Sequence, residues 1–421
     1  MLVLITYLIY SLGLFFWSLS SIQYDSAAPA IRYGGALLLL GIFLWIISIL
    51  DKKKTIRSGV TIMAVFINLG LSVAYRCTSE EALVLRISDL RNTYAGQTVL
   101  MISAFLLIYC IVRFTRIYKT TLFNLAAGVS VLVVVSGARL TGTKTGGSYL
   151  YFVNIMVFSW VLFCFPFIAS YLLSRKEDAY VGRNVKNLSW NLFVLLSYTF
   201  LLYLESVLNK EFGLVFLIGA TTCVLFYVHC RNTNTLAKIF YTGICAAGAL
   251  TAAEFVPHIR DRVQLWFHPE LADSAEMKRK AEAVLYLFRY YKKNMGWYGR
   301  GIGTLSKSRV PTLRSDHVLL TLMNDYSILL VAMVLLLSVL LIRYLLISPK
   351  GVETFDRYLS LAIALTIGFA MLLNVASVLG SFIQAGVSFP WVSASGGQIN
   401  LAVTALFATH CGIAAKGDDT M

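Results

Sequence analysis

The sequence is poor in charge: only 14% of its 421 residues are charged, and only 21 of them are acidic. Because soluble globular chains carry about 25% charged residues, this composition excludes an ordinary soluble domain. The seven cysteines contain no Cys-x-x-Cys pair and no metal-like spacing to histidine, and five of them fall within apolar runs. Neither a cysteine metal site nor a disulfide framework is therefore expected.

Long apolar runs dominate instead, and apolar residues make up 58% of the chain. The runs match the length of membrane-spanning helices, whereas barrel strands need only about ten residues each. We predict an all-α fold, a polytopic transmembrane helix bundle with about twelve spans. The expected spans are residues 2–22, 33–50, 58–76, 98–115, 121–138, 149–174, 188–207, 213–230, 236–256, 318–347, 358–380 and 398–415.

Lysine and arginine gather in alternate connections, such as 52–57, 113–119 and 175–186. Since basic residues in short loops stay in the cytoplasm, this pattern predicts that both termini are cytoplasmic. The first run lacks a basic segment before it and a convincing cleavage site after it, so we interpret it as a retained helix. Topology explains much of the +15 net charge, and no nucleic-acid partner is expected.

The longest connection, residues 257–316, precedes the tenth span and is expected to be extracytoplasmic. It holds twelve Lys or Arg residues against six Asp or Glu, which is allowed because long loops escape the positive-inside bias. Apolar side chains at helical spacing over 277–291 predict an amphipathic helix. That helix lies in the outer membrane interface or packs on the bundle with a solvated charged face.

Asp316 ends this loop at the start of an apolar run. A carboxylate beside arginines at the lip of a membrane cavity is suited to act as a general base. An aspartate before an apolar run is equally suited to cap the helix that follows. Both interpretations of Asp316 remain open from the residues alone.

The same loop carries three short motifs: Trp266-Phe-His-Pro269, Gly296-Trp-Tyr-Gly299-Arg-Gly301-Ile-Gly303 and Pro311-Thr-Leu-Arg-Ser-Asp316. Asn324-Asp325 follows them. This order resembles the SEDS proteins (shape, elongation, division and sporulation), the FtsW/RodA/SpoVE group. Their loop contains Trp-x-x-Pro, Gly-Trp-x-Gly-x-Gly-x-Gly and Pro-Glu-x-x-Thr-Asp-Phe, followed by an acidic pair.

A second stretch is similar to the same family. The family's Asn-x-Gly-Met-x-x-Gly and Gly-x-x-x-Pro-Phe-x-Ser-Tyr-Gly-Gly-Ser are matched by Asn374 to Gly380 and by Gly386 to Ser393, which includes Pro390. One extra residue precedes the pair Gly396-Gly397, and Gln398 replaces the usual serine. The resemblance covers about residues 136–415, which suggests a SEDS-like core at 136–421. Residues 1–135 would then hold N-terminal helices, including about two beyond the family's core of ten.

The chain also departs from the family. The signature Gln-Pro-Ser-Glu is absent, and Tyr151-Phe-Val-Asn154 stands in its place. The glutamate that usually follows Pro311 is Thr312.

The resemblance implies a peptidoglycan glycosyltransferase of the bacterial cytoplasmic membrane that polymerises lipid II, the undecaprenyl-diphosphate-linked disaccharide-peptide, in division, elongation or sporulation. A class B penicillin-binding protein is the implied protein partner, alongside membrane lipids. Asp316 would be catalytic. The residues expected to contact substrate are Arg300, Arg309, Arg314, Lys278, Lys280, Asn374 and Ser393. The remaining motif positions would be structural: Trp266, Pro269, Gly296, Gly299, Gly301, Gly303, Pro311, Asp325, Gly386, Pro390, Gly396 and Gly397.

No cofactor is implied with certainty, and a divalent cation beside Asp316 is left open. Three other functions compete with the polymerase. A flippase for lipid-linked sugars is suggested by polar residues within the spans, such as Asn154, Glu205 and Asn374. A non-catalytic scaffold is suggested by the altered motifs. A polymerase or ligase of the O-antigen type would share the large loop.

Overall fold

A computed structural model of the chain describes most of the apolar runs. The described residues are 11–13, 28–51, 54–77, 93–145, 148–175, 190–209, 211–229, 260, 263, 299, 316–347, 352–379, 381–382, 386–394 and 397–419. The long helices are α2 (Ala28–Leu50), α3 (Arg57–Cys77), α5 (Tyr94–Phe114), α6 (Thr121–Thr141), α7 (Val157–Ser174), α8 (Trp190–Leu208), α9 (Phe212–His229), α14 (Ile328–Ile347), α15 (Thr354–Val378) and α16 (Gly397–Asp419). Two short helices, η1 (Ile117–Lys119) and α13 (Val318–Asp325), join them.

The chain is an all-α polytopic membrane protein. Nine of the described helices are long and apolar enough to cross a membrane, and a slightly shorter apolar helix covers Gly213–His229. Eight predicted spans match single helices. The predicted spans 2–22 and 236–256 lie outside the described residues, apart from helical residues 11–13.

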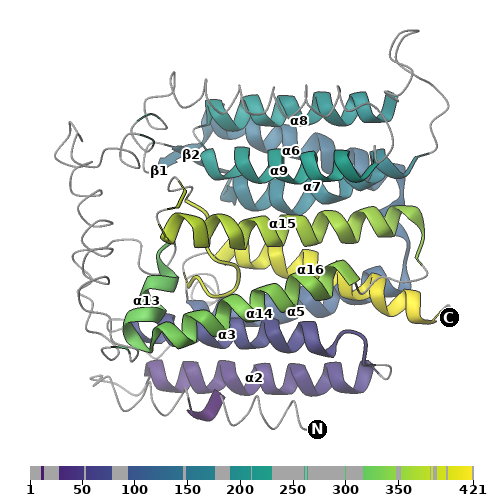
Figure 1. The fold of residues 1–421 in the computed structure, drawn as a ribbon. Helices are drawn as coiled ribbons and strands as arrows, with labels where there is room; N and C mark the ends of the chain where they lie inside the picture. Colours follow the sequence, from purple (N-terminus) through teal and green to yellow (C-terminus); the bar gives the residue numbers. More distant parts are fainter. Residues whose placement is uncertain are drawn as a thin grey trace.

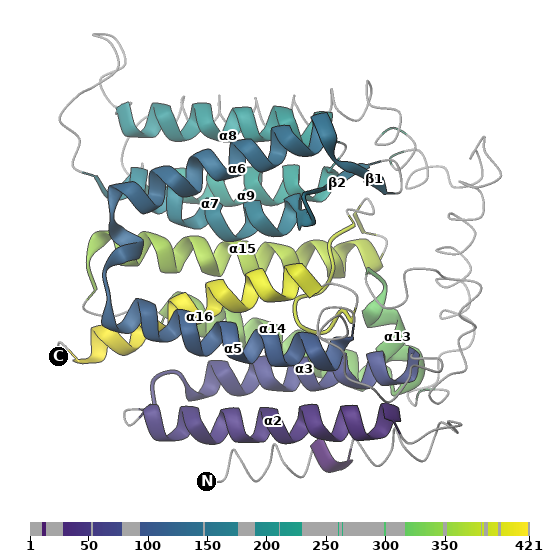
Figure 2. The ribbon, with the colours of Figure 1, turned by 180° about the vertical axis from the view of Figure 1, so that it is seen from behind.

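The helices lie side by side in one bundle (Figures 1 and 2). Helix α16 runs through the middle of the bundle, where it packs most extensively against α5, while α15 packs against α7. The side chains of α16 are almost all buried. Helix α2 covers α3 and α5 at one side, and Phe43 of α2 meets Phe105 of α5 edge to face, with ring centroids 5.2 Å apart.

The predicted span 149–174 is wrong in its first third. Residues up to Met156 form strands: β1 (Thr143–Thr145), β2 (Ser148–Phe152) and β3 (Ile155–Met156) pair in an antiparallel sheet of order β1-β2-β3. Aromatic and β-branched residues favour strands, yet they are as apolar as a membrane helix, so hydropathy alone cannot separate the two. The ring of Phe152 in β2 lies against Gly137 of α6, where a Cβ atom would come within 2.7 Å of it.

The predicted span 318–347 is two helices rather than one. Helix α13 ends at Asp325, and α14 begins at Ile328. The Ser327 hydroxyl oxygen accepts a hydrogen bond from Leu330 N at 3.1 Å, as an N-cap side chain does, so a new helix starts there.

The three-stranded sheet β1-β2-β3, which we call the hairpin, lies with α13 and the loop 386–394 at one end of the bundle, the hairpin end (Figures 1 and 2). The opposite end holds the α2–α3 and α5–α6 connections and the last turns of α16. There, Lys119 Nζ binds Glu353 Oε2 at 3.0 Å and Asp356 Oδ2 at 2.5 Å, and the Tyr118 hydroxyl donates to Asp356 Oδ1. The hydrogen bond from Lys119 lowers the pKa of the Glu353 carboxyl. This network ties the α5–α6 connection to the start of α15.

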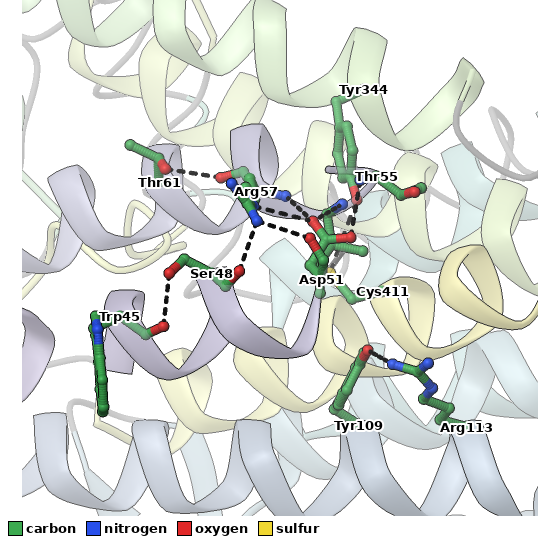
Figure 3. A network of polar contacts seen from close by, with 11 residues as sticks. Trp45, Ser48, Asp51, Thr55, Arg57, Thr61, Tyr109, Arg113, Tyr344 and Cys411 are labelled. Atoms are coloured by element: carbon green, nitrogen blue, oxygen red, sulfur yellow. Dashed lines mark hydrogen bonds and ion pairs between the residues drawn. The ribbon is translucent and has the colours of Figure 1, made fainter. Parts of the chain in front are cut away.

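Asp51, also at the opposite end, orders the residues that lead into α3 (Figure 3). Its carboxylate accepts from the backbone N–H groups of Thr55, Ile56 and Arg57 at 2.9–3.1 Å. Arg57 returns a bond from Nη2 to the backbone oxygen of Ser48 at 2.6 Å, which joins α2 to α3.

We expect Asp51→Ala to lower the free energy of unfolding by about 1–2 kcal/mol, because the N–H groups of Thr55, Ile56 and Arg57, where the chain enters α3, lose their acceptor. The measurement is the midpoint of thermal unfolding in detergent. Asp51→Asn is the matched control and should lose less, since its amide oxygen still accepts. An alanine variant as stable as the wild type would contradict the capping role.

Candidate functional site

Asp316 lies at the hairpin end, in the turn directly before α13, and is partly buried. The N-cap residue of α13 is His317, one position later, so Asp316 is not itself the N-cap. The backbone oxygen of Asp316 accepts a hydrogen bond from Asn374 Nδ2 at 3.0 Å. This bond ties the turn that carries the carboxylate to α15.

Asn374 joins two segments that are far apart in sequence. Its side chain is 1% exposed, and Nδ2 also donates to the backbone oxygen of Val387 at 2.7 Å. Both acceptors are carbonyl oxygens, so the orientation of the amide is unambiguous. With both amide hydrogens bonded to backbone, the nitrogen of Asn374 serves to hold Asp316 against the loop 386–394.

The loop 386–394 turns into the bundle around Trp391, which is fully buried and has a φ of 60°. A bulky residue rarely adopts this left-handed conformation, so other groups must hold it. Asn400 of α16 does so: its Oδ1 accepts from Trp391 N at 2.8 Å, and its Nδ2 donates to Ser393 O at 2.9 Å. The Trp391 indole N–H donates to Thr404 Oγ1 at 2.9 Å.

Two neighbouring helices close around the same loop. The Tyr94 hydroxyl of α5 donates to the backbone oxygen of Trp391. Phe66 of α3 stacks on Trp391 with ring centroids 6.3 Å apart. Gly70 of α3 leaves space for the hydrogen bond between Tyr94 and the Trp391 oxygen, because a Cβ atom at Gly70 would lie 2.6 Å from that oxygen. The loop is therefore held from α3, α5, α15 and α16 together.

Two of the predicted motif residues, Gly299 and Asp325, lie at or next to the break between α13 and α14. Gly299 donates its N–H to the Tyr326 oxygen at 2.7 Å, and a Cβ atom there would lie 2.4 Å from the Tyr326 backbone. Only glycine permits that approach, so one glycine of the Gly-rich motif meets the break between α13 and α14. Asp325 is buried at the end of α13, and its Oδ1 accepts from Asn324 Nδ2 at 3.0 Å.

The other described motif residues lie in the loop or at its edges. Gly386 has a φ of 67°, and Pro390 is buried. Ser393 is fully buried, and its N–H donates to the Phe389 oxygen at 3.1 Å. Gly397 begins α16 beside the Gln97 side chain. The remaining predicted site residues lie outside the described residues: Lys278, Lys280, Arg300, Arg309, Arg314, Trp266, Pro269, Gly296, Gly301, Gly303, Pro311 and Gly396.

Within the described ranges, no three His, Cys, Asp or Glu side chains converge into a group that could hold a metal ion. A divalent cation beside Asp316 stays an open prediction.

A family model places the chain among known proteins. The model FTSW_RODA_SPOVE, described as "Cell cycle protein", matches residues 56–416. The chain belongs to the FtsW/RodA/SpoVE family. The match begins at the start of α3, so α2 and helical residues 11–13 precede it.

Curated family relatives are distant in sequence. The probable peptidoglycan glycosyltransferase FtsW of Pseudoalteromonas translucida is 23% identical over 292 residues, which is 67% of this chain and 69% of that protein. The peptidoglycan glycosyltransferase RodA of Mycobacterium tuberculosis is 23% identical over 194 residues, which is 46% of this chain and only 40% of that protein.

Two solved structures share the fold of this chain. RodA of Thermus thermophilus aligns with a TM-score of 0.56 at 13% identity, covering 86% of this chain and 96% of that one. A chain from a peptidoglycan synthase complex that coordinates polymerization and crosslinking aligns with a TM-score of 0.63 at 14% identity, covering 86% and 97%.

The family motifs led from the sequence to Asp316, Asn374 and the loop, but not to Tyr94 or Asn400. Asn400 is fully buried within an apolar helix. An amide in a membrane span needs hydrogen-bond partners, so Asn400 within an apolar run indicates a tertiary contact inside the bundle. Nothing in the sequence told which backbone groups those partners would be.

Proposed function

We propose that this chain is a peptidoglycan glycosyltransferase, the activity that its named FtsW and RodA relatives carry, and that it polymerises lipid II at the hairpin end. The observation that carries the proposal is the Asn374 amide, which holds the backbone of Asp316 at 3.0 Å and that of Val387 at 2.7 Å. A carboxylate on a turn tied to the bundle is pre-organised to act on a bound substrate.

The distribution of charge supports an extracytoplasmic position for the hairpin end. Most of the described basic residues lie at the opposite end, where Arg57, Arg113, Arg116, Lys119 and Lys416 lie on or next to helix termini; Arg139 of α6 and Lys144 of β1 are among the fewer at the hairpin end. Basic residues in short connections stay cytoplasmic, so the opposite end would face the cytoplasm and both termini would lie there. Asp316 would then face the side on which peptidoglycan is built.

The proposed reaction is a glycosyl transfer. A sugar hydroxyl of the acceptor gives its proton to Asp316 while its oxygen forms a bond to the anomeric carbon of the donor. The bond from that carbon to phosphate breaks, and undecaprenyl diphosphate leaves with the electron pair. A base of this kind accounts for about 10²–10⁴-fold in rate. Arg300, Arg309, Arg314, Lys278 and Lys280 are proposed to neutralise the departing diphosphate.

The proposed protein partner is a class B penicillin-binding protein, which would crosslink the new glycan. The related chain from a complex of polymerization and crosslinking supports this pairing. The chemistry needs such a partner, because glycosyl transfer forms strands and leaves the peptides unjoined.

Polymerisation of labelled lipid II by the purified protein tests the proposal, with and without the co-purified partner. We expect glycan polymer on a gel from the wild type. A related polymerase in the same assay is the positive control. Transport of labelled lipid II across vesicles without polymer would instead favour a flippase, and neither activity would favour a scaffold.

A further inference from the structure

The Gln398 side chain reaches from the first turn of α16 to the turn between β2 and β3. Its Oε1 accepts from Met156 N at 2.7 Å, and its Nε2 donates to Asn154 O at 2.9 Å. One partner is a donor and the other an acceptor, so the orientation of the amide is unambiguous. The Gln398 side chain therefore joins α16 to two residues that lie 242 and 244 positions earlier in the chain.

The turn that Gln398 holds is strained. Val153 has a φ of 45° and Asn154 a φ of 63°, so both central residues are left-handed, as in a type I′ turn. Asparagine tolerates this conformation, but a β-branched residue such as valine is an outlier there. Val153 is also 76% exposed, so packing of its side chain does little to keep it in place. The hydrogen bonds from Gln398 offset part of that strain.

By the resemblance drawn from the sequence, both sides of this contact depart from the family motifs. Tyr151 to Asn154 stands where the family has Gln-Pro-Ser-Glu, and Gln398 stands where it has serine after the glycine pair. In the structure the replaced segment and the replaced residue bind each other.

The first turn of α16 also contacts the loop 386–394, to which Asn374 ties the backbone of Asp316. Asn400, two residues after Gln398, binds Trp391 and Ser393 of the loop. The loop continues to Val387, which Asn374 joins to the Asp316 backbone. The first turn of α16 thus contacts the hairpin through Gln398 and the loop that holds Asp316 through Asn400.

We propose that Gln398 is a positioning residue of the polymerase: it clamps the strained Val153–Asn154 turn against α16, so that the hairpin forms a fixed wall of the lipid II site. This inference rests on the proposed function. A hairpin that moves more freely would make fewer contacts with bound lipid II, so loss of the Gln398 hydrogen bonds should weaken substrate binding.

Gln398→Ser restores the family residue and removes the bonds to Met156 N and Asn154 O, together with a longer bond of 3.5 Å from Ser159 Oγ to Oε1. We expect the KM for lipid II to rise about tenfold, the effect of losing roughly 1.4 kcal/mol of hydrogen bonding. The decisive variant is the double substitution Gln398→Ser with Val153→Gly. Glycine adopts a φ of 45° without strain, so the turn keeps its shape unaided and the KM should return most of the way to the wild-type value.

Tyr198→Phe is the matched control, because it removes one interhelical hydrogen bond, from Tyr198 to the Gly128 oxygen at 3.2 Å, away from the hairpin. Its KM should stay at the wild-type value. A second readout needs no activity: amide hydrogen exchange in the peptide that contains Met156 should speed up in Gln398→Ser, since that N–H loses its acceptor.

An unchanged KM in Gln398→Ser, with an active wild type, would overturn the positioning role alone. So would a raised KM that Val153→Gly fails to restore, because the strained turn would then not be what Gln398 holds. No polymer from the wild type would overturn the proposed function and the positioning role with it. The exchange rate at Met156 still reports on the clamp in that case, which keeps the two failures distinct.

Discussion

Asp316→Asn is expected to reduce the rate of lipid II polymerisation by about 10²–10⁴-fold, the usual contribution of a general base. Asparagine has nearly the same volume and still forms hydrogen bonds, but it does not accept the proton of the attacking sugar hydroxyl. The bond from Asn374 is made to the backbone of residue 316, so the substitution leaves it intact. The loss should therefore fall on the chemical step, and binding of labelled lipid II should persist.

Glu353→Gln is the matched control for Asp316→Asn. It neutralises a carboxylate of the same chain at the opposite end of the bundle, where Glu353 binds Lys119 at 3.0 Å. We expect wild-type polymerisation from this variant. Polymerisation at the wild-type rate in Asp316→Asn would show that another group takes the proton.

The helices could be predicted from sequence because their burial in a membrane demands long apolar runs. The same rule failed at residues 149–156, where tyrosine, leucine and phenylalanine satisfy a strand as well as a span. It also failed at Tyr326, because leucine-rich segments flank the break on both sides. Ser327 was the local signal for a new helix, and hydropathy does not weigh a single serine.

The candidate site was predictable only where the family motifs reach. They pointed to Asp316, Asn374 and the loop from Gly386 to Ser393. They gave no sign that Trp391 adopts a left-handed conformation, because that conformation depends on Asn400, Tyr94 and Thr404 from other helices. Tertiary hydrogen bonds overrule the local preference of tryptophan, and a single sequence does not show which ones form.

Asn374→Leu is expected to reduce polymerisation nearly as far as the loss of the Asp316 carboxylate. Leucine fits the volume but leaves the backbone oxygens of Asp316 and Val387 without the donor that holds them at 3.0 and 2.7 Å. Each buried carbonyl that loses its partner costs about 1–3 kcal/mol, which the protein avoids by letting the turn and the loop move apart. Asp316 then leaves its position, and a displacement of about 1 Å costs roughly 10²-fold in rate.

A loss of stability alone would also lower the measured rate, so the comparison needs a second buried asparagine. Asn68 of α3 is fully buried, donates to Ser11 Oγ at 3.0 Å and accepts from the Tyr33 hydroxyl at 3.3 Å, and neither of these bonds reaches Asp316. Asn68→Leu should lower the unfolding midpoint about as much as Asn374→Leu does, yet retain polymerisation per folded molecule. Equal losses of rate in the two variants would mean that Asn374 stabilises the bundle without positioning the base.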